Sequence, residues 1–295
     1  MLQDIRDIPA AGPEDILSLN FLRSSPPVVF RRHFRQGLRS HVLEVLDPND
    51  VEAERTGRME NGLLRFPRAR PRRMFRVFRT RFRDLADGLE ETRRVKTVER
   101  YLCPEFMARS HEFLADYLLE GAREILLCGL QEYVEGEALD PWSPVGEGLL
   151  REIAFRVRSH VSGSFEEPPN PFLEHVRDRA AVFIARVKRM ILEAACIPDL
   201  AGVSNLILTP AGNIQLVDIN NISAVSFAPS IVLDDKGYPI CDKSVQALAL
   251  LERKLLGRRP DRTERLYRVF LDPERIRKVR TAEELFHRGA GSTGR

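Results

Sequence analysis

The segment from 197 to 222 constrains the fold of this 295-residue chain most strongly, because polar residues stand in it at the ends of short apolar runs. Two apolar runs, 206–208 and 214–217, flank a cluster of turn-forming residues, and this pattern predicts a short β-hairpin. The ends of a hairpin lie close together, so we expect Asn205 before the first strand and Asp218 after the second to converge. Amide and carboxylate oxygens suit Mg²⁺. The segment therefore predicts a magnesium site made by Asn205 and Asp218.

The order of Asp199, Asn205 and Asp218 along the chain resembles that of the protein-kinase-like superfamily. In that superfamily a catalytic-loop Asp and Asn are followed, after a hairpin, by the metal-binding Asp of a D-F-G triplet, which here reads Asp218-Ile219-Asn220. The resemblance implies that Asp199 orients and deprotonates an acceptor hydroxyl, while Asn205 and Asp218 hold Mg²⁺. It also implies an α+β, two-lobed kinase-like fold. The small lobe would have an antiparallel sheet plus one helix, and the large lobe would be mainly helical.

A second part of the resemblance lies upstream, where an apolar strand leads into QEYVEG at residues 131–136. This stretch is similar to the hinge between the two kinase lobes, whose backbone binds adenine. The resemblance implies that the carbonyl of Glu132 and the N–H of Val134 bind the adenine of ATP, with Gln131 at the back of the pocket. It divides the chain into an N-terminal extension (1–25), a small lobe (26–131), a hinge (132–136), a large lobe (137–288) and a flexible tail (289–295).

The strand predicted at 74–78 would match the third strand of a kinase small lobe, which carries a Lys that binds the nucleotide phosphates and pairs with a Glu. Arg76 occupies that place here, and Glu91, on a helix predicted at 84–101, is its expected partner. An arginine can bind phosphate bidentately but does not reproduce a compact ammonium. The chain also has no G-x-G-x-x-G, and its 199–205 loop is one residue longer than the common kinase loop. These departures are compatible with a divergent kinase and equally with a catalytically silent pseudokinase that acts as a scaffold.

A basic stretch at 65–83 suggests a different class of function, because it holds many arginines, no acid and four interleaved phenylalanines. Such a stretch could follow a nucleic-acid backbone and stack bases. The alternative, which we favour, is an alternating strand with apolar residues inward and arginines outward. The acid-rich segment at 84–99 would then offset the charge locally.

The rest of the composition points to a cytoplasmic protein. No apolar run approaches the roughly 18 residues that a membrane-spanning helix needs, and the N-terminus lacks the basic and apolar regions of a secretion signal. The four scattered cysteines predict buried, reduced thiols. We therefore expect a cytoplasmic phosphotransferase that uses ATP and Mg²⁺. The short segment at 219–241 favours a small molecule, a sugar, a lipid or an unusual protein as its acceptor.

Several further elements follow from periodicity and turn chemistry. Polar residues at 47–61 predict a loop or insertion, and those at 162–171 a Pro-rich loop. A turn is expected at 36–38, between the first two strands of the small lobe. Helical periodicity appears at 147–160 and 171–195, and Asp242 is the expected N-cap of a helix that ends before Gly257.

Overall fold

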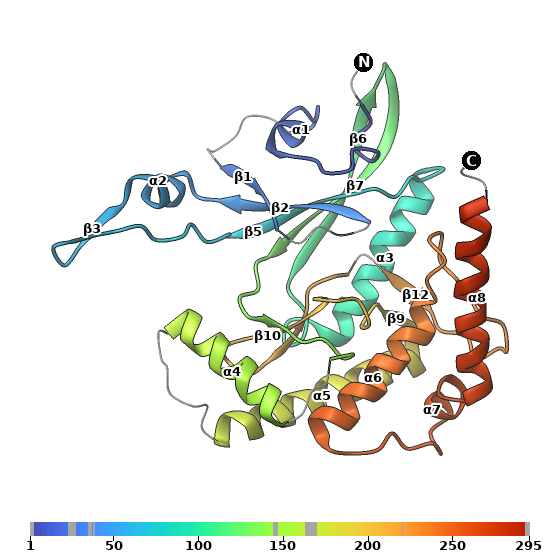
Figure 1. Cartoon of the computed structure of the whole chain (residues 1–295). Helices are drawn as coiled ribbons and strands as arrows, with labels where there is room; N and C mark the ends of the chain where they lie inside the picture. Colours follow the sequence, from blue (N-terminus) through green and yellow to red (C-terminus); the bar gives the residue numbers. More distant parts are fainter. Residues whose placement is uncertain are drawn as a thin grey trace. The chain divides into compact units, whose positions relative to one another are not determined.

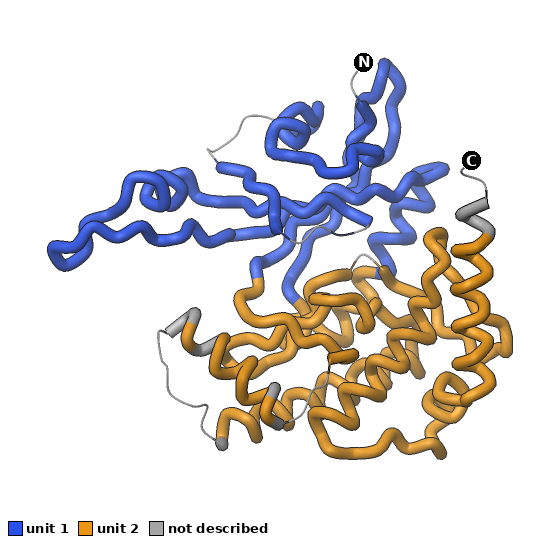
Figure 2. Tube along the Cα trace, viewed as in Figure 1, with its two compact units in different colours: residues 1–94, 108–133 blue, residues 95–107, 134–295 orange. Residues whose placement is uncertain are grey.

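The computed structural model combines helices with antiparallel strands, which confirms the expected α+β class (Figure 1). It describes the chain except for residues 1–2, 23–27, 35–36, 38, 144–146, 163–169, 220 and 293–295. The chain divides into two compact units (Figure 2). Unit 1 comprises residues 1–94 and 108–133, and unit 2 comprises residues 95–107 and 134–295.

Unit 1 is built on a five-stranded antiparallel sheet with the strand order β1-β2-β5-β7-β6. The strands are β1 (Val29–Arg32), β2 (Ser40–Leu46), β5 (Arg73–Phe78), β6 (Ser110–Leu119) and β7 (Ala122–Glu132). Glu120 and Gly121 join β6 to β7, and both have positive φ, at 50° and 85°. A two-residue turn of this kind matches the twist of a hairpin and fixes the register of its strands. The expected turn at 36–38 falls mostly outside the described residues.

The N-terminal segment, expected as an extension, packs into the core of unit 1. It contains the short helix α1 (Pro13–Leu17), and Ile5, Ile16 and Leu19 are buried against apolar residues of the sheet. His41 of β2 is fully buried and joins the segment to the sheet: its Nε2 lies 2.8 Å from the carbonyl of Ile5, and its Nδ1 accepts a hydrogen bond from the N–H of Ala11. The segment is therefore part of the folded unit.

For the segment 47–61, where a loop or an insertion was predicted, the loop alternative is wrong. This segment contains helix α2 (Pro48–Thr56) and strand β3 (Arg58–Glu60), which pairs with β4 (Leu63–Arg65). The periodicity of α2 does not reveal it, because the helix is polar and none of its residues is fully buried. Its start signal is nevertheless present: Asp47 accepts a hydrogen bond from the N–H of Asn49 at 2.8 Å, and a proline follows at the first helical position.

Unit 2 packs helices around one large apolar core. Its helices are the second half of α3 (Leu85–Leu102), α4 (Glu147–Ser162), α5 (Asn170–Ala194), α6 (Ile240–Leu256), α7 (Arg265–Phe270) and α8 (Pro273–Ser292). The helices predicted at 84–101, 147–160 and 171–195 are confirmed within a few residues. Helix α8 continues into the segment expected as a tail, and the loop predicted at 162–171 lies mostly outside the described residues. None of the described helices is long and apolar enough to cross a membrane.

Short strands of unit 2 carry the segment that opened the sequence analysis. They are β8 (Glu137–Ala138), β9 (Cys196–Pro198), β10 (Leu206–Leu208), β11 (Ile214–Leu216) and β12 (Ile222–Ala224). Strands β10 and β11 pair antiparallel, so the predicted hairpin is confirmed. Strand β12 returns to pair with β9, which brings the two ends of the segment together.

Asp242 is not the N-cap of α6, which corrects the prediction. The helix begins at Ile240 after Pro239, and Asp242 lies buried in its first turn. There the Arg275 side chain donates two hydrogen bonds to the Asp242 carboxylate, at 2.6 and 3.1 Å. The carboxylate was available for this long-range ion pair because the helix starts three residues earlier than the capping pattern suggested.

Candidate functional site

Asp199 and Asn205 bracket the loop between β9 and β10, and both side chains are buried, with exposed fractions of 7% and 6%. The loop starts where β9 pairs with β12, and the N–H of Asp199 donates to the carbonyl of Asn221 at 2.8 Å. At its other end, the carbonyl of Asn205 accepts a hydrogen bond from Val217 at 2.9 Å. Backbone pairing therefore fixes both ends of the loop.

Asp199 binds its own loop through one carboxylate oxygen. Its Oδ1 accepts hydrogen bonds from the N–H groups of Ala201 at 3.0 Å and Gly202 at 3.1 Å. Both of these backbone donors act on Oδ1. Burial raises the pKa of Asp199, the N–H of Ala201 opposes this shift, and the negative charge of Asp218 raises the pKa further. The side-chain amide of Asn205 also lowers the pKa of Asp199. A carboxylate with one oxygen anchored and a raised pKa can accept a proton.

Asn205 is oriented by a hydrogen bond that its side chain donates. Its Nδ2 lies 2.8 Å from the main-chain carbonyl of Asp199, so the amide oxygen Oδ1 is left without a donor among the described residues. The fit is close, because a Cβ at Gly202 would lie 2.8 Å from Oδ1. Ser204, just before Asn205, has a φ of 70°, a backbone conformation that is rare for residues other than glycine and that recurs at functional sites.

Asp218 follows β11, two residues after the last hairpin strand residue, Leu216. Its charge acts on Asp199, so the hairpin brings the electrostatic influence of Asp218 to the loop. The described residues hold no group of three or more His, Cys, Asp or Glu arranged for a metal ion. Any cation here would therefore depend on an amide or main-chain oxygen as well as a carboxylate. Asn220 of the D-I-N triplet lies outside the described residues.

Two residues that the sequence did not single out hold this loop in place. The fully buried Ser244 of α6 accepts a hydrogen bond from the N–H of Leu200 at 3.1 Å. The indole N–H of Trp142 donates to the carbonyl of Ala201 at 2.9 Å. The available signal for Ser244 was a hydroxyl among the mostly apolar residues that α6 buries. No local pattern marks Trp142.

Tyr238 is a third residue that the sequence did not mark. Burial raises the pKa of its hydroxyl, and the negative charge of Asp199 raises it further. The hydroxyl is therefore neutral across the physiological range and lies within the field of the loop carboxylate. A neutral hydroxyl in such a place can donate a hydrogen bond.

In unit 1, the structure brings Arg76 to Gln131 and not to Glu91. Nη2 of Arg76 donates to Oε1 of Gln131 at 2.5 Å, and both side chains are buried, whereas Glu91 pairs with Arg94 at 3.4 Å. Burial raises the pKa of Glu91, and the charge of Arg94 opposes that shift. The predicted ion pair between Arg76 and Glu91 is therefore wrong, because Arg76 bonds to Gln131 and Glu91 pairs with Arg94. The expectation that the strand arginines point outward also fails at Arg76, because β5 is central in the sheet and buried on both faces.

The end of β7 carries the residues expected to contact adenine. Nε2 of Gln131 is buried and has no hydrogen-bond partner within the described part of the chain. The N–H of Glu132 donates to the carbonyl of Arg109 at 2.9 Å, while Val134, which belongs to unit 2, donates no N–H hydrogen bond to any described residue. Val134 therefore has a main-chain donor available for a ligand.

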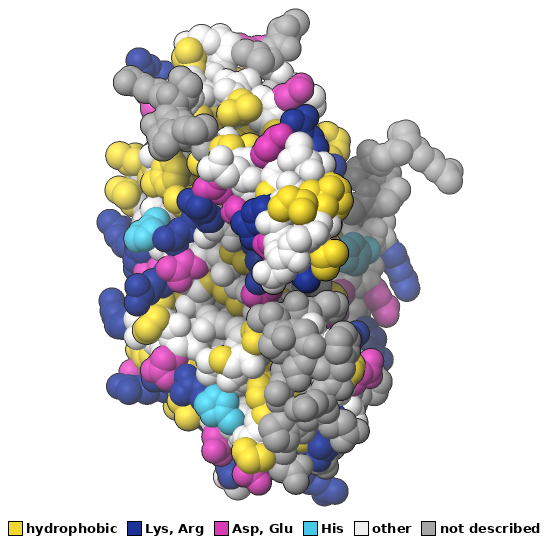
Figure 3. Space-filling view, turned by 90° about the vertical axis from the view of Figure 1, so that its left-hand side faces the viewer, with side chains coloured by type: hydrophobic (Ala, Val, Ile, Leu, Met, Phe, Trp, Pro, Cys, Tyr) yellow, Lys and Arg dark blue, Asp and Glu magenta, His cyan; other side chains and the backbone are white. Residues whose placement is uncertain are grey.

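The basic stretch at 65–83 is largely neutralised by carboxylates distant in sequence. Arg72 pairs with Asp47, Arg73 with Glu132, and Arg81 with Asp4 and Asp7. Two of the four interleaved phenylalanines, Phe75 and Phe78, are core residues. On the face drawn in Figure 3, basic side chains are interspersed with acidic ones. The local offset expected from 84–99 is seen at Arg83, which pairs with Asp87.

Comparison with known proteins assigns no family to the chain: no protein-family model matches it, and no curated protein matches its sequence. The functional argument therefore depends on the geometry of the loop at 199–205, the hairpin that follows it, and the side chains of unit 1.

Proposed function

We propose that this protein is a magnesium-dependent phosphotransferase that transfers the terminal phosphoryl group of ATP to a hydroxyl acceptor. Asp199 would orient the acceptor and take up its proton through Oδ2. Asn205 and Asp218 would hold Mg²⁺ through side-chain oxygens, which are the hard ligands that this ion prefers. When bound, Mg²⁺ would neutralise charge on the phosphates.

The observation that carries this proposal is the division of roles within the 199–205 loop. Asp199 anchors the loop through two backbone donors to one oxygen, Oδ1, and Asn205 directs its amide nitrogen toward Asp199 and keeps its oxygen available. The charge of Asp218 disfavours ionisation of Asp199, and a cation beside Asp218 would relieve that repulsion. These residues fit a cation with oxygen ligands and a nearby proton acceptor.

The same proposal assigns phosphate binding to Arg76 and adenine contacts to Gln131, Glu132 and Val134. The unpartnered Nε2 of Gln131 and the available N–H of Val134 support it. Glu91 pairs with Arg94, so we assign it no direct contact with Arg76. Its role would be limited to contributing negative charge to the surroundings of Arg76.

A catalytically silent scaffold with a kinase-like fold is the second candidate, and one contact favours it. Arg76 donates to Gln131, and Glu91 of α3, at the place of the carboxylate that orients the corresponding lysine in active kinases, pairs with Arg94 instead. A neutral amide orients a phosphate-binding side chain less firmly than a carboxylate does. The nucleic-acid alternative at 65–83 has less support, because several of its arginines pair with carboxylates and two of its aromatic rings are buried.

Phosphoryl transfer from labelled ATP to water, to the protein itself and to extracted metabolites separates the two candidates. Replacing Asp199 by Asn keeps the shape and the anchoring oxygen but removes the base, so transfer should fall about 10²–10⁴-fold while ATP binding stays nearly unchanged. Asp178→Asn, at an exposed position of α5, is the matched control and should behave as wild type. A wild-type protein that binds Mg·ATP and transfers phosphate to no acceptor would be a scaffold.

A further inference from the structure

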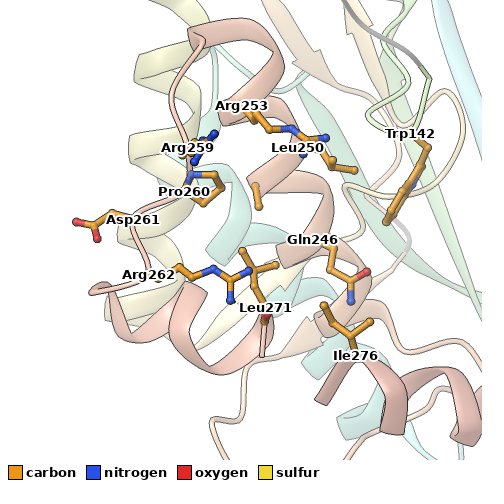
Figure 4. Close-up of a pocket in the computed structure, with 11 residues that line it drawn as sticks. Trp142, Gln246, Leu250, Arg253, Arg259, Pro260, Asp261, Arg262, Leu271 and Ile276 are labelled. Atoms are coloured by element: carbon orange, nitrogen blue, oxygen red, sulfur yellow. Dashed lines mark hydrogen bonds between the residues drawn. The ribbon is translucent and has the colours of Figure 1, made fainter. Parts of the chain in front are cut away.

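Unit 2 contains a pocket of about 830 Å³ whose lining residues lie outside the 199–205 loop (Figure 4). Its walls come from the C-terminal half of α6, the connection from α6 to α7, the start of α8 and the segment around Trp142. Pockets of a few hundred to a thousand cubic ångströms are the size that small organic ligands occupy. The volume therefore suits a metabolite and not a macromolecule.

The charge of this pocket is strongly positive. Arg253, Arg259 and Arg262 line it, and Asp261 is the one carboxylate among its lining residues. Figure 4 shows the Asp261 carboxylate directed away from the other side chains, and its Oδ1 accepts a hydrogen bond from Thr263 at 2.8 Å. Within the described part of the chain, no carboxylate lies at salt-bridge distance from Arg253 or Arg259. Arg253 and Arg259 therefore bring positive charge to the pocket without a paired carboxylate, while Nη1 of Arg262 donates to the carbonyl of Leu271 at 3.3 Å.

One wall of the pocket is aromatic and apolar. Trp142 is 43% exposed, and its indole N–H is fixed by the carbonyl of Ala201 at 2.9 Å. The neighbouring carbonyl of Pro141 accepts a hydrogen bond from Lys254 of α6 at 2.6 Å, which holds the Trp142 segment against the helix. Leu250 and Ile276 extend the apolar wall. The ring is thus preorganised, with a face open to a ligand.

We propose that this pocket binds a small ligand that carries both a phosphate group and a planar ring. Arginine binds phosphate through paired N–H groups, and two or three guanidinium groups around one anion give charge-assisted hydrogen bonds. Stacking on the indole face adds affinity for a planar group. The proposal does not require phosphotransferase activity, because none of the lining residues belongs to the 199–205 loop or the hairpin, although Trp142 also donates its indole N–H to Ala201 of that loop.

Phenyl phosphate and inorganic phosphate are the probes, because they share the anion and differ in the ring. Trp142 is the chain's single tryptophan, so its fluorescence reports directly on the pocket. We expect saturable changes in emission with both, and binding of phenyl phosphate about threefold to tenfold tighter, as one stacking contact implies. Equal affinities, or no saturation below about 10 mM phenyl phosphate, would overturn the proposal.

Substitutions separate this pocket from general attraction of anions to a basic surface. The double variant Arg253→Ala, Arg259→Ala should weaken phenyl phosphate binding at least about tenfold, since it removes two charge-assisted contacts. Arg258→Ala removes the same charge from an exposed neighbour that does not line the pocket and should leave affinity unchanged. In calorimetry, Trp142→Leu should abolish the preference for phenyl phosphate and keep inorganic phosphate binding. Equal losses in the Arg258 variant would contradict the assignment.

Discussion

Gly202 is the residue on which the position of Asn205 depends most directly. A Cβ at this position would lie 2.8 Å from Oδ1 of Asn205, closer than side-chain carbons approach such atoms. The absence of a side chain lets the loop turn tightly between Asp199 and Asn205. The amide can then donate to the Asp199 carbonyl and keep its oxygen free.

We predict that Gly202→Ala displaces the Asn205 amide and weakens Mg²⁺ binding roughly tenfold or more, as changes beside metal ligands typically do. The measurement is a Mg²⁺ titration in the presence of ATP. Gly148→Ala is the control, because a Cβ at Gly148 in α4 meets nothing within 4 Å. An unchanged Mg²⁺ affinity in the Gly202 variant would separate Asn205 from metal binding.

His41 makes the fold of unit 1 sensitive to acid. Burial lowers the pKa of His41, the carbonyl of Ile5 partly opposes the shift, and the charge of Arg79 lowers the pKa further. The folded state therefore binds fewer protons than the unfolded state below the ordinary histidine pKa. Stability contributed by neutral His41 is fully present above pH 6.5 and is lost as the pH falls from 6.5 toward the depressed folded value.

We predict that the thermal midpoint of the wild type falls on acidification below pH 6.5, and that His41→Gln shows a smaller fall. Glutamine keeps a donor for the Ile5 carbonyl but does not titrate. Hydrogen exchange at the N-terminal segment should rise over the same pH range, because His41 holds Ile5 and Ala11. Identical pH profiles for the two proteins would show that another group governs acid sensitivity.

At the scale of elements, helix α6 connects the candidate site to the C-terminal part of unit 2. The Ser244 hydroxyl accepts a hydrogen bond from the N–H of Leu200 in the loop, and the Asp242 carboxylate accepts one from Arg275 of α8. Arg275 also donates to the carbonyl of Ala228 at 2.7 Å, so one guanidinium ties three segments together. The N-terminal end of α6 therefore supports the loop and anchors α8.

We predict that Arg275→Ala lowers the free energy of unfolding by about 3–5 kcal/mol, because it leaves the Asp242 carboxylate buried without its partner. Lys278→Ala on the same helix breaks an exposed pair with Glu274 and should cost less than about 1 kcal/mol. Urea unfolding of both variants measures the contrast. Similar losses would mean that the buried pair contributes no more than a surface pair.

The sequence predicts those elements whose buried apolar residues recur with the period of a helix or a strand. The hairpin, α3, α4 and α5 show such traces, and their limits agree within a few residues. Helix α2 was missed because it has no buried face, and the start of α6 was misplaced because Asp242 is used by a residue 33 positions away. Long-range pairs such as Arg76 with Gln131 leave no local signal at all. The order of Asp199, Asn205 and Asp218 could be read from the sequence, whereas the support from Trp142 could not.

At the scale of the whole molecule, the two units supply different chemistry. Unit 2 holds the oxygen groups proposed for Mg²⁺ and proton transfer, and unit 1 holds the buried arginine and the strand end proposed for the nucleotide. A phosphotransferase and a silent scaffold could both contain these residues, and they differ in whether a cation is needed for nucleotide binding. Asp218 is the residue on which that difference depends.

The most direct measurement is the affinity for ATP with and without Mg²⁺, in the wild type and in Asp218→Asn. The substitution keeps the size of the side chain and removes the charge that would hold the cation. We predict that Mg²⁺ tightens ATP binding to the wild type at least about tenfold and that Asp218→Asn loses most of this gain. An ATP affinity that is independent of Mg²⁺, or equally dependent on it in both proteins, would contradict the proposed metal site.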